Sequence, residues 1–95
     1  MSLETLTSKY IVSAEKVFSE VEVSEKSVIV DVDSVRKVLS FAKDYLDDAK
    51  YYRDKSKFEV CLASVAYCEG LLDALRLLGM VKFEWTAEKK WEKEK

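Results

Sequence analysis

The sequence predicts an all-α protein, a three-helix bundle whose second and third helices form an antiparallel hairpin. The 95-residue chain contains no proline and only two glycines, so long segments run without a helix-breaking residue. Apolar residues recur three and four positions apart over most of the chain, which is the helical period. A hydrophobic fraction of 48% is too high for a disordered chain. The length fits one domain, which we place at residues 1–83.

The first predicted helix covers residues 5–21. Its apolar residues form one stripe at a period of about 3.6 residues: Leu6, Tyr10, Ala14, Val17, Phe18 and Val21. The charged residues of the segment lie mostly off that stripe. We expect the stripe to pack against the other two helices.

Residues 22–33 interrupt the helical pattern. The first half is polar, and the second half, residues 28–32, is rich in β-branched residues that favour an extended chain. No second run of this kind offers a partner strand. We therefore expect a loop whose valines cover the end of the helical core, with Asp31 or Asp33 capping the next helix.

The second predicted helix covers residues 34–54 and continues through a short turn into the third. Its apolar positions follow the helical spacing throughout: Val35, Val38, Leu39, Ala42, Tyr45, Leu46, Ala49 and Tyr52. Ser56 and Glu59 have the spacing of a capping box at the start of the third helix. So short a turn makes the two helices antiparallel neighbours.

The third predicted helix, residues 57–78, has so wide an apolar surface that we expect it to be the central helix of the bundle. Leu62 falls at the centre of its main stripe, where truncation to alanine should cost roughly 2–5 kcal/mol. Gly70, in the interior, suggests the close approach of a neighbouring helix. Gly79 stands where a left-handed residue ends a helix, with Leu75 and Met80 placed for the accompanying contact. Residues 84–95 form a charged tail, expected to be a frayed helix or disordered.

The composition excludes several chemistries. With no histidine, zinc fingers and Cys–His or Ser–His–Asp sites are ruled out. There is no glycine-rich phosphate loop, so we expect no catalytic residue, no cofactor and no enzyme activity. Carboxylates four residues apart, such as Asp44 with Asp48, could attract a cation, but nearby lysines and arginines favour a solvated charged face and no metal site.

The net charge of the chain indicates which partners it can bind, and its cysteines indicate its cellular compartment. A net charge of −2 argues against a phosphate-binding surface. Lysines lie near Trp85 and Trp91, but glutamates cancel most of that charge, so nucleic-acid binding is not favoured. Cys61 and Cys68 are two helical turns apart, about 10 Å, which is too far for a disulfide. Free thiols indicate the cytoplasm, and no apolar run approaches the ~20 residues that cross a membrane.

Two segments of the sequence resemble those of a known protein family. Residues 45–52, YLDDAKYY, and residues 63–79, ASVAYCEGLLDALRLLG, resemble the archaeal domain-of-unknown-function family 357. The resemblance covers roughly residues 8–83 and implies a short helical bundle from archaea, without a reaction. Members fused to nucleotidyltransferase-type domains would imply an accessory role in nucleotide or RNA metabolism. Family members commonly carry glycine in the turn, where this chain has Ser56.

Four residues are the candidate binding positions: Tyr67, Asp73, Phe83 and Trp85. Tyr67 is predicted level with Asp44 and Tyr45, where its hydroxyl could hydrogen-bond a carboxylate. In the predicted hairpin, Asp73 lies level with Val38 and so near Arg36 and Lys37, as a salt-bridge partner or a ligand-facing acid.

The most direct functional interpretation is a small protein–protein interaction or scaffold module that forms a homodimer or binds another protein; the alternative is the accessory role. Three short helices cannot cover every apolar residue, and large exposed apolar patches usually mark interfaces. Phe83 and Trp85 are the predicted anchors of the dimer contact. The alternative for these two side chains is that they fold back over the chain's own helices.

Overall fold

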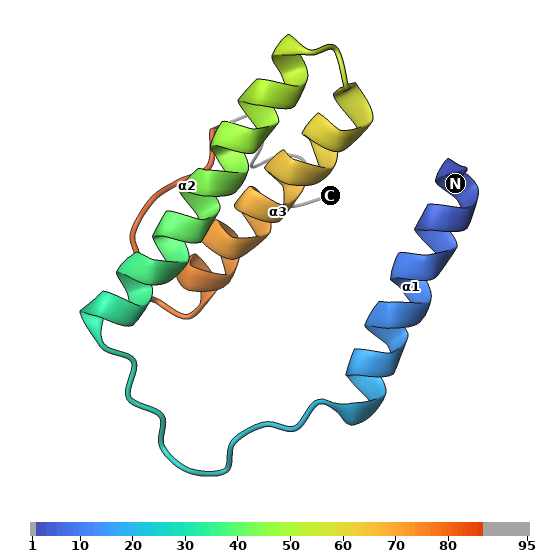
Figure 1. The fold of residues 1–95 in the computed structure, drawn as a ribbon. Coiled ribbons are helices and arrows are strands. Elements are labelled where there is room, and N and C mark those ends of the chain that lie inside the picture. The colour runs from blue at the N-terminus through green and yellow to red at the C-terminus, as the bar shows by residue number, and fades with distance from the viewer. Residues whose placement is uncertain (1, 87–95) are drawn as a thin grey trace.

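The computed structural model describes residues 2–86, and these residues form three helices and no strand (Figure 1). The helices are α1 (Leu3–Glu20), α2 (Val32–Asp54) and α3 (Phe58–Leu77). The all-α class is confirmed, as is the antiparallel pairing of the second and third helices. Residues 87–95 of the predicted tail lie outside the described residues.

The hairpin of α2 and α3 contains the core. Four residues are buried, two small ones from α2 and two from α3: Ala42, Ala49, Cys68 and Leu75. The alanines let the two helix backbones come close, and larger side chains on either side are only half-buried. The contact is therefore narrow, and much of the apolar surface of α3 lies outside it.

The buried side of α3 differs from the predicted one. Cys61, Cys68 and Leu75 follow each other at seven-residue intervals along the contact with α2, whereas Leu62 is 68% exposed. The expectation that Leu62 is a core residue is wrong, because a helix apolar on two sides gives no sequence signal for which side meets its neighbour. Gly70 has no atom near the position of an added Cβ, so the predicted close approach of another helix is also wrong.

α1 lies apart from the hairpin (Figure 1). Among the described residues, α2 and α3 are the only helices that pack on each other, and α1 has no buried residue. The Cα radius of gyration is 15.8 Å, against about 12.4 Å for a compact chain of this length. The predicted stripe of α1 is present, but it does not reach the core.

The connector, residues 21–31, explains this separation. Val21 and Asp31 have extended backbones at its two ends, and Ile29 is 94% exposed. β-branched residues favour extended chain, and the connector bends only at residues 25–26, so it forms a wide open loop below the hairpin that turns the chain from α1 back into α2 (Figure 1). The expectation that its valines cover the core is wrong for that reason.

The turn between α2 and α3 is closed by backbone hydrogen bonds. The Ser56 N–H donates to the Arg53 carbonyl at 3.0 Å and the Lys57 N–H to the Tyr52 carbonyl at 2.8 Å, the two bonds of a Schellman cap. Ser56 occupies the left-handed position with φ 59°. Lys57 is the N-cap of α3 and makes no side-chain capping bond, so the predicted capping box is wrong. Gly79, with φ 75°, ends α3 in the same motif, as predicted.

Ser56→Gly should stabilise the hairpin by about 1 kcal/mol, because the left-handed region is strained for residues with a Cβ and free for glycine. Ser56→Ala should change stability by less, since the hydroxyl caps nothing. Urea unfolding of the two variants tests this expectation. A large loss in Ser56→Ala would show that the hydroxyl does act as a cap.

Asp31, one of the two residues predicted to cap the second helix, is the N-cap of α2. Its carboxylate accepts a hydrogen bond of 2.7 Å from the Ser34 backbone N–H. This backbone bond, followed by one from the Ser34 side chain, lowers the pKa of Asp31 below its ordinary value of 3.8. The cap thus favours the charged carboxylate in the folded state.

Because folding lowers this pKa, the stabilisation is fully present above pH 3.8 and is lost as the pH falls through the lower folded value. Asp31→Asn keeps a capping oxygen but does not titrate. Its thermal midpoint should therefore fall less between pH 6 and pH 3 than that of the wild type. Parallel curves for the two proteins would contradict a role for the charged cap.

Candidate functional site

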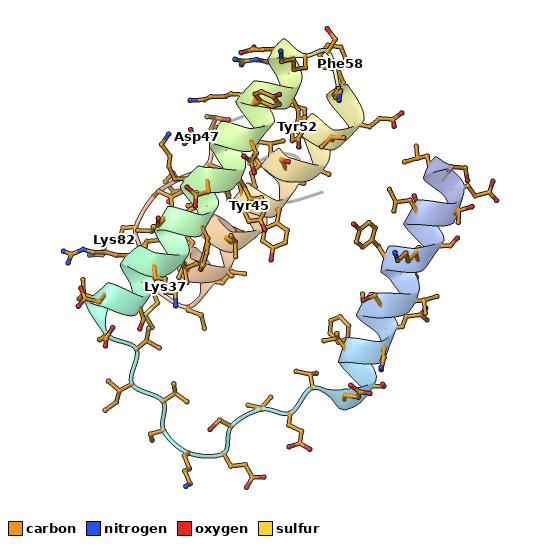
Figure 2. All side chains as sticks on the ribbon, in the orientation of Figure 1. Lys37, Tyr45, Asp47, Tyr52, Phe58 and Lys82 are labelled. Atoms are coloured by element: carbon orange, nitrogen blue, oxygen red, sulfur yellow. The ribbon has the colours of Figure 1, made fainter. Side chains whose placement is uncertain are left out.

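The four candidate residues lie in two separate places. Asp73, Phe83 and Trp85 meet where the segment after α3 folds back on the hairpin. Tyr67 lies elsewhere, beside Tyr45 on the side of the hairpin that faces α1 (Figure 2). The two places have different chemistry, and we describe them in turn.

Asp73 is the centre of the first cluster. Its Oδ1 accepts from Arg76 Nη2 at 3.0 Å and from Trp85 Nε1 at 3.1 Å. The Asp73 side chain is 21% exposed and that of Arg76 is 36% exposed. The salt bridge between Asp73 and Arg76 therefore lies within α3. The predicted pairing with Arg36 or Lys37 is wrong, since Arg36 lies 3.6 Å from Asp33 instead.

Phe83 and Trp85 complete this cluster. Their rings meet edge to face with centroids 4.9 Å apart, and the Arg76 guanidinium lies 6.0 Å from the centre of the Phe83 ring. Both aromatic residues thus contact residues of the chain's own α3. The segment after α3 runs along the side of the hairpin away from α1 (Figure 1). The cluster ties the C-terminal segment to α3 and uses its polar groups in doing so.

The second place is an apolar groove between α2 and α3. One hollow, of about 260 Å³, is lined by two residues of each helix, and the adjoining one, of about 470 Å³, shares two of these residues and adds Tyr10 of α1. We call the α2–α3 walls the tyrosine groove: Phe41, Tyr45, Val60, Ala63, Ser64, Tyr67 and Leu71.

Aromatic rings shape the middle of the tyrosine groove. Tyr45 and Tyr67 stack with ring centroids 4.3 Å apart and planes inclined by 26°. No hydrogen bond joins Tyr67 to Asp44 within residues 2–86, so the hydroxyl contact expected from the sequence is replaced by this stack. Phe41 is 49% exposed, Val60 45% and Tyr67 56%. The groove is therefore open to solvent along most of its length.

The side chains that line the tyrosine groove determine which kinds of ligand or reaction it can support. It contains hydroxyl groups but no charged side chain, so it lacks a base for nucleophilic catalysis and a cation for binding phosphate. An apolar groove between two helices suits the apolar face of a third helix. In the described part of the chain, no three His, Cys, Asp or Glu side chains gather as metal ligands.

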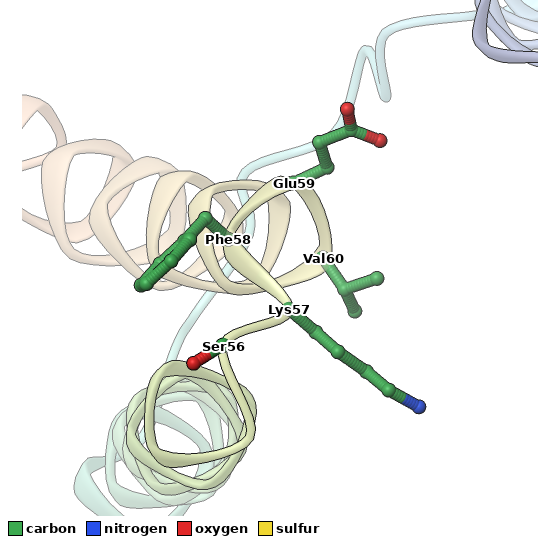
Figure 3. Close-up of a pocket in the computed structure, with 5 residues that line it drawn as sticks. All are labelled: Ser56, Lys57, Phe58, Glu59 and Val60. Carbon is green, nitrogen blue, oxygen red and sulfur yellow. The ribbon is translucent and has the colours of Figure 1, made fainter.

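A further depression lies at the α2–α3 turn and is lined by residues 56–60 (Figure 3). All of its lining residues are consecutive, and the side chains of Lys57 and Glu59 point away from each other. No polar groups converge on a common point there. We therefore place no site at the turn.

The two thiols are both free, as predicted. Cys68 is buried between α2 and α3. Burial, and to a smaller extent the nearby Glu69 carboxylate, raises the pKa of the Cys68 thiol above 9.0. A raised pKa keeps the thiol protonated and unreactive at neutral pH. No helix among residues 2–86 is long and apolar enough to span a bilayer.

The comparisons with known proteins identify a family and little else. The model of a family described as "Protein of unknown function (DUF357)" matches residues 9–81. That range contains both cluster residues of α3 and every residue of the tyrosine groove. Neither a curated protein nor a solved structure matches the chain.

Proposed function

Because the chain belongs to the DUF357 family, whose description assigns no reaction, we propose a function from the geometry. The protein is a self-associating interaction module whose tyrosine groove binds an amphipathic helix. The observation that carries the proposal is the groove itself, an apolar and aromatic surface between α2 and α3 that is open to solvent.

The physical reason for a binding role is that apolar side chains exposed to water in the groove are less favourable than the same side chains buried against a partner. Burying apolar surface contributes about 25 cal/mol per Å², and exposed apolar patches on small proteins commonly mark interfaces. Tyrosine rings are favoured in such contacts, since each ring offers a large area with few rotatable bonds. The absence of a basic side chain from the groove favours a protein partner over the accessory role in nucleotide or RNA metabolism, where phosphate has to be bound.

The proposal assigns the dimer contact to residues other than the two predicted from the sequence. Phe83 and Trp85 are engaged with α3 of their own chain, so the contact depends instead on Tyr45, Tyr67 and Val60. We expect a homodimer, the commonest closed arrangement of identical chains.

Ala63→Arg tests the groove directly. Ala63 is an exposed residue of the groove wall, so an arginine there fills the groove without disturbing the α2–α3 contact. We expect light scattering to give about twice 11.0 kDa for the wild type and 11.0 kDa for the variant. The dimer should weaken at least about thirtyfold, the effect of a hot-spot residue.

Ala66→Arg is the matched control. Ala66 is exposed on the same helix but does not line the groove, so this variant should keep the wild-type mass. Equal masses for all three proteins would show that the groove is not the contact surface. Circular dichroism of both variants checks that the hairpin is intact.

A further inference from the structure

We infer that the tyrosine groove of one chain is filled by α1 of a second chain, so that the protein is a helix-exchanged dimer. This inference rests on the proposed function and names the helix that the groove binds. The candidate occupant is present in the chain, and no other helix among residues 2–86 packs on it. Apart from the half-buried Leu6, the apolar residues of its stripe are exposed, with Phe18 at 81% and Tyr10 at 66%.

α1 needs a packing partner to remain helical. It has 18 residues, and its interior holds β-branched and serine residues that form helices weakly. The weak formers are Thr5, Thr7, Ser8, Ile11, Val12, Ser13, Val17 and Ser19. Helices of this length draw most of their stability from burying an apolar face. An α1 helix in solution therefore implies a surface that receives its stripe.

The groove matches that stripe in kind and length. From Leu6 to Val17 the stripe covers twelve residues, and from Val60 to Leu71 the α3 wall of the groove also covers twelve, a rise of about 17 Å in each case. Tyr10 already lines the rim of the larger hollow together with Tyr45 and Tyr67. Among the described residues, α1 makes no helix–helix contact with α2 or α3 of its own chain.

The connector leaves α1 free to reach a second chain. Its eleven residues form a wide open loop with extended ends (Figure 1), and α1 at the end of this loop does not pack on α2 or α3 of its own chain. In a dimer with two-fold symmetry, each chain then places its α1 in the groove of the other, so that both grooves are filled.

The exposed area is sufficient for such a dimer. The chain exposes 8414 Å², against roughly 5,600 Å² for a compact monomer of its mass. A standard interface buries only about 800 Å² from each partner. Two exchanged helices can therefore form a stable interface without any change in the hairpin.

A mixing experiment on the full-length chain tests the exchange. Val17→Asp places a charge on the stripe of α1, and Ala63→Arg blocks the groove. Each variant alone should have a mass of 11.0 kDa. A one-to-one mixture should contain a species of twice that mass, because α1 of the Ala63→Arg chain enters the intact groove of the Val17→Asp chain. Val12→Asp, on the polar face of α1, and Ala66→Arg are the controls and should stay dimeric.

The other outcomes separate the exchange from self-association. If Val17→Asp alone is a dimer, or if the mixture stays monomeric while the wild type is a dimer, the exchange is overturned but self-association stands. A monomeric wild type overturns both. If that monomer is also destabilised by Val17→Asp and not by Val12→Asp, α1 packs on its own hairpin.

Discussion

Leu75→Ala is expected to destabilise the hairpin by roughly 2–5 kcal/mol, the cost of truncating a buried leucine. Leu75 is 6% exposed and is the largest of the four buried residues. Its carbonyl also accepts the Met80 N–H at 2.9 Å in the cap that ends α3. A two-helix contact has few other buried side chains to compensate for the cavity.

Leu62→Ala is the matched comparison, since it is the same substitution on the same helix at a side chain that is 68% exposed. In urea unfolding monitored at 222 nm, Leu75→Ala should lower the midpoint strongly, and Leu62→Ala should cost less than about 1 kcal/mol. The reverse order would mean that the buried face of α3 is the one centred on Leu62.

Ala42→Asp should be comparably severe and cost about 3 kcal/mol or more. Ala42 is 2% exposed, the most buried residue of the core, and no basic side chain is buried near it to pair with a carboxylate among the described residues. A buried charge without a partner is among the most destabilising changes a small core can receive.

Ser40→Asp puts the same side chain on an exposed position two residues earlier in α2 and should change stability by less than about 0.5 kcal/mol. Thermal unfolding of both variants at pH 7 checks the expectation. If Ala42→Asp melts within a few degrees of the wild type, the α2–α3 contact is not the core of the protein.

The helical spacing of apolar residues and the capping residues at helix ends were sufficient to predict the three helices of the fold. Regular apolar spacing predicted three helices, the pair Asp31 and Asp33 marked the start of α2 to within two residues, and Gly79 predicted the end of α3. These features depend on residues within one or two turns of each other. Local physical chemistry therefore determines them, and one sequence is enough to find them.

Features that depend on contacts between elements were harder to predict. Both sides of α3 are apolar, so its pattern does not distinguish the side facing α2 from the groove. The bond from Trp85 to Asp73 joins residues twelve positions apart across a helix end, where no period applies. The left-handed Ser56 has a residue type that gives no sign of its conformation.

The candidate site was predictable only in part. Tyr67 was identified from the sequence, but its partner is a stacked ring in place of a carboxylate. Phe41, Val60 and Ala63 were missed as groove residues, since their grouping depends on how α2 and α3 rotate about their axes. The unusual width of the apolar surface of α3 was the one signal that pointed to a second apolar face, outside the contact with α2.

Hydrogen exchange of the α1 amides at several protein concentrations tests the central claim most directly, because protection reports whether that helix is packed. If α1 fills the groove of a second chain, its amides are protected where the mass is twice 11.0 kDa and lose protection on dilution, while those of α2 and α3 keep theirs. α1 amides that exchange freely at every concentration would contradict the claim, as would protection that does not change on dilution to a monomer.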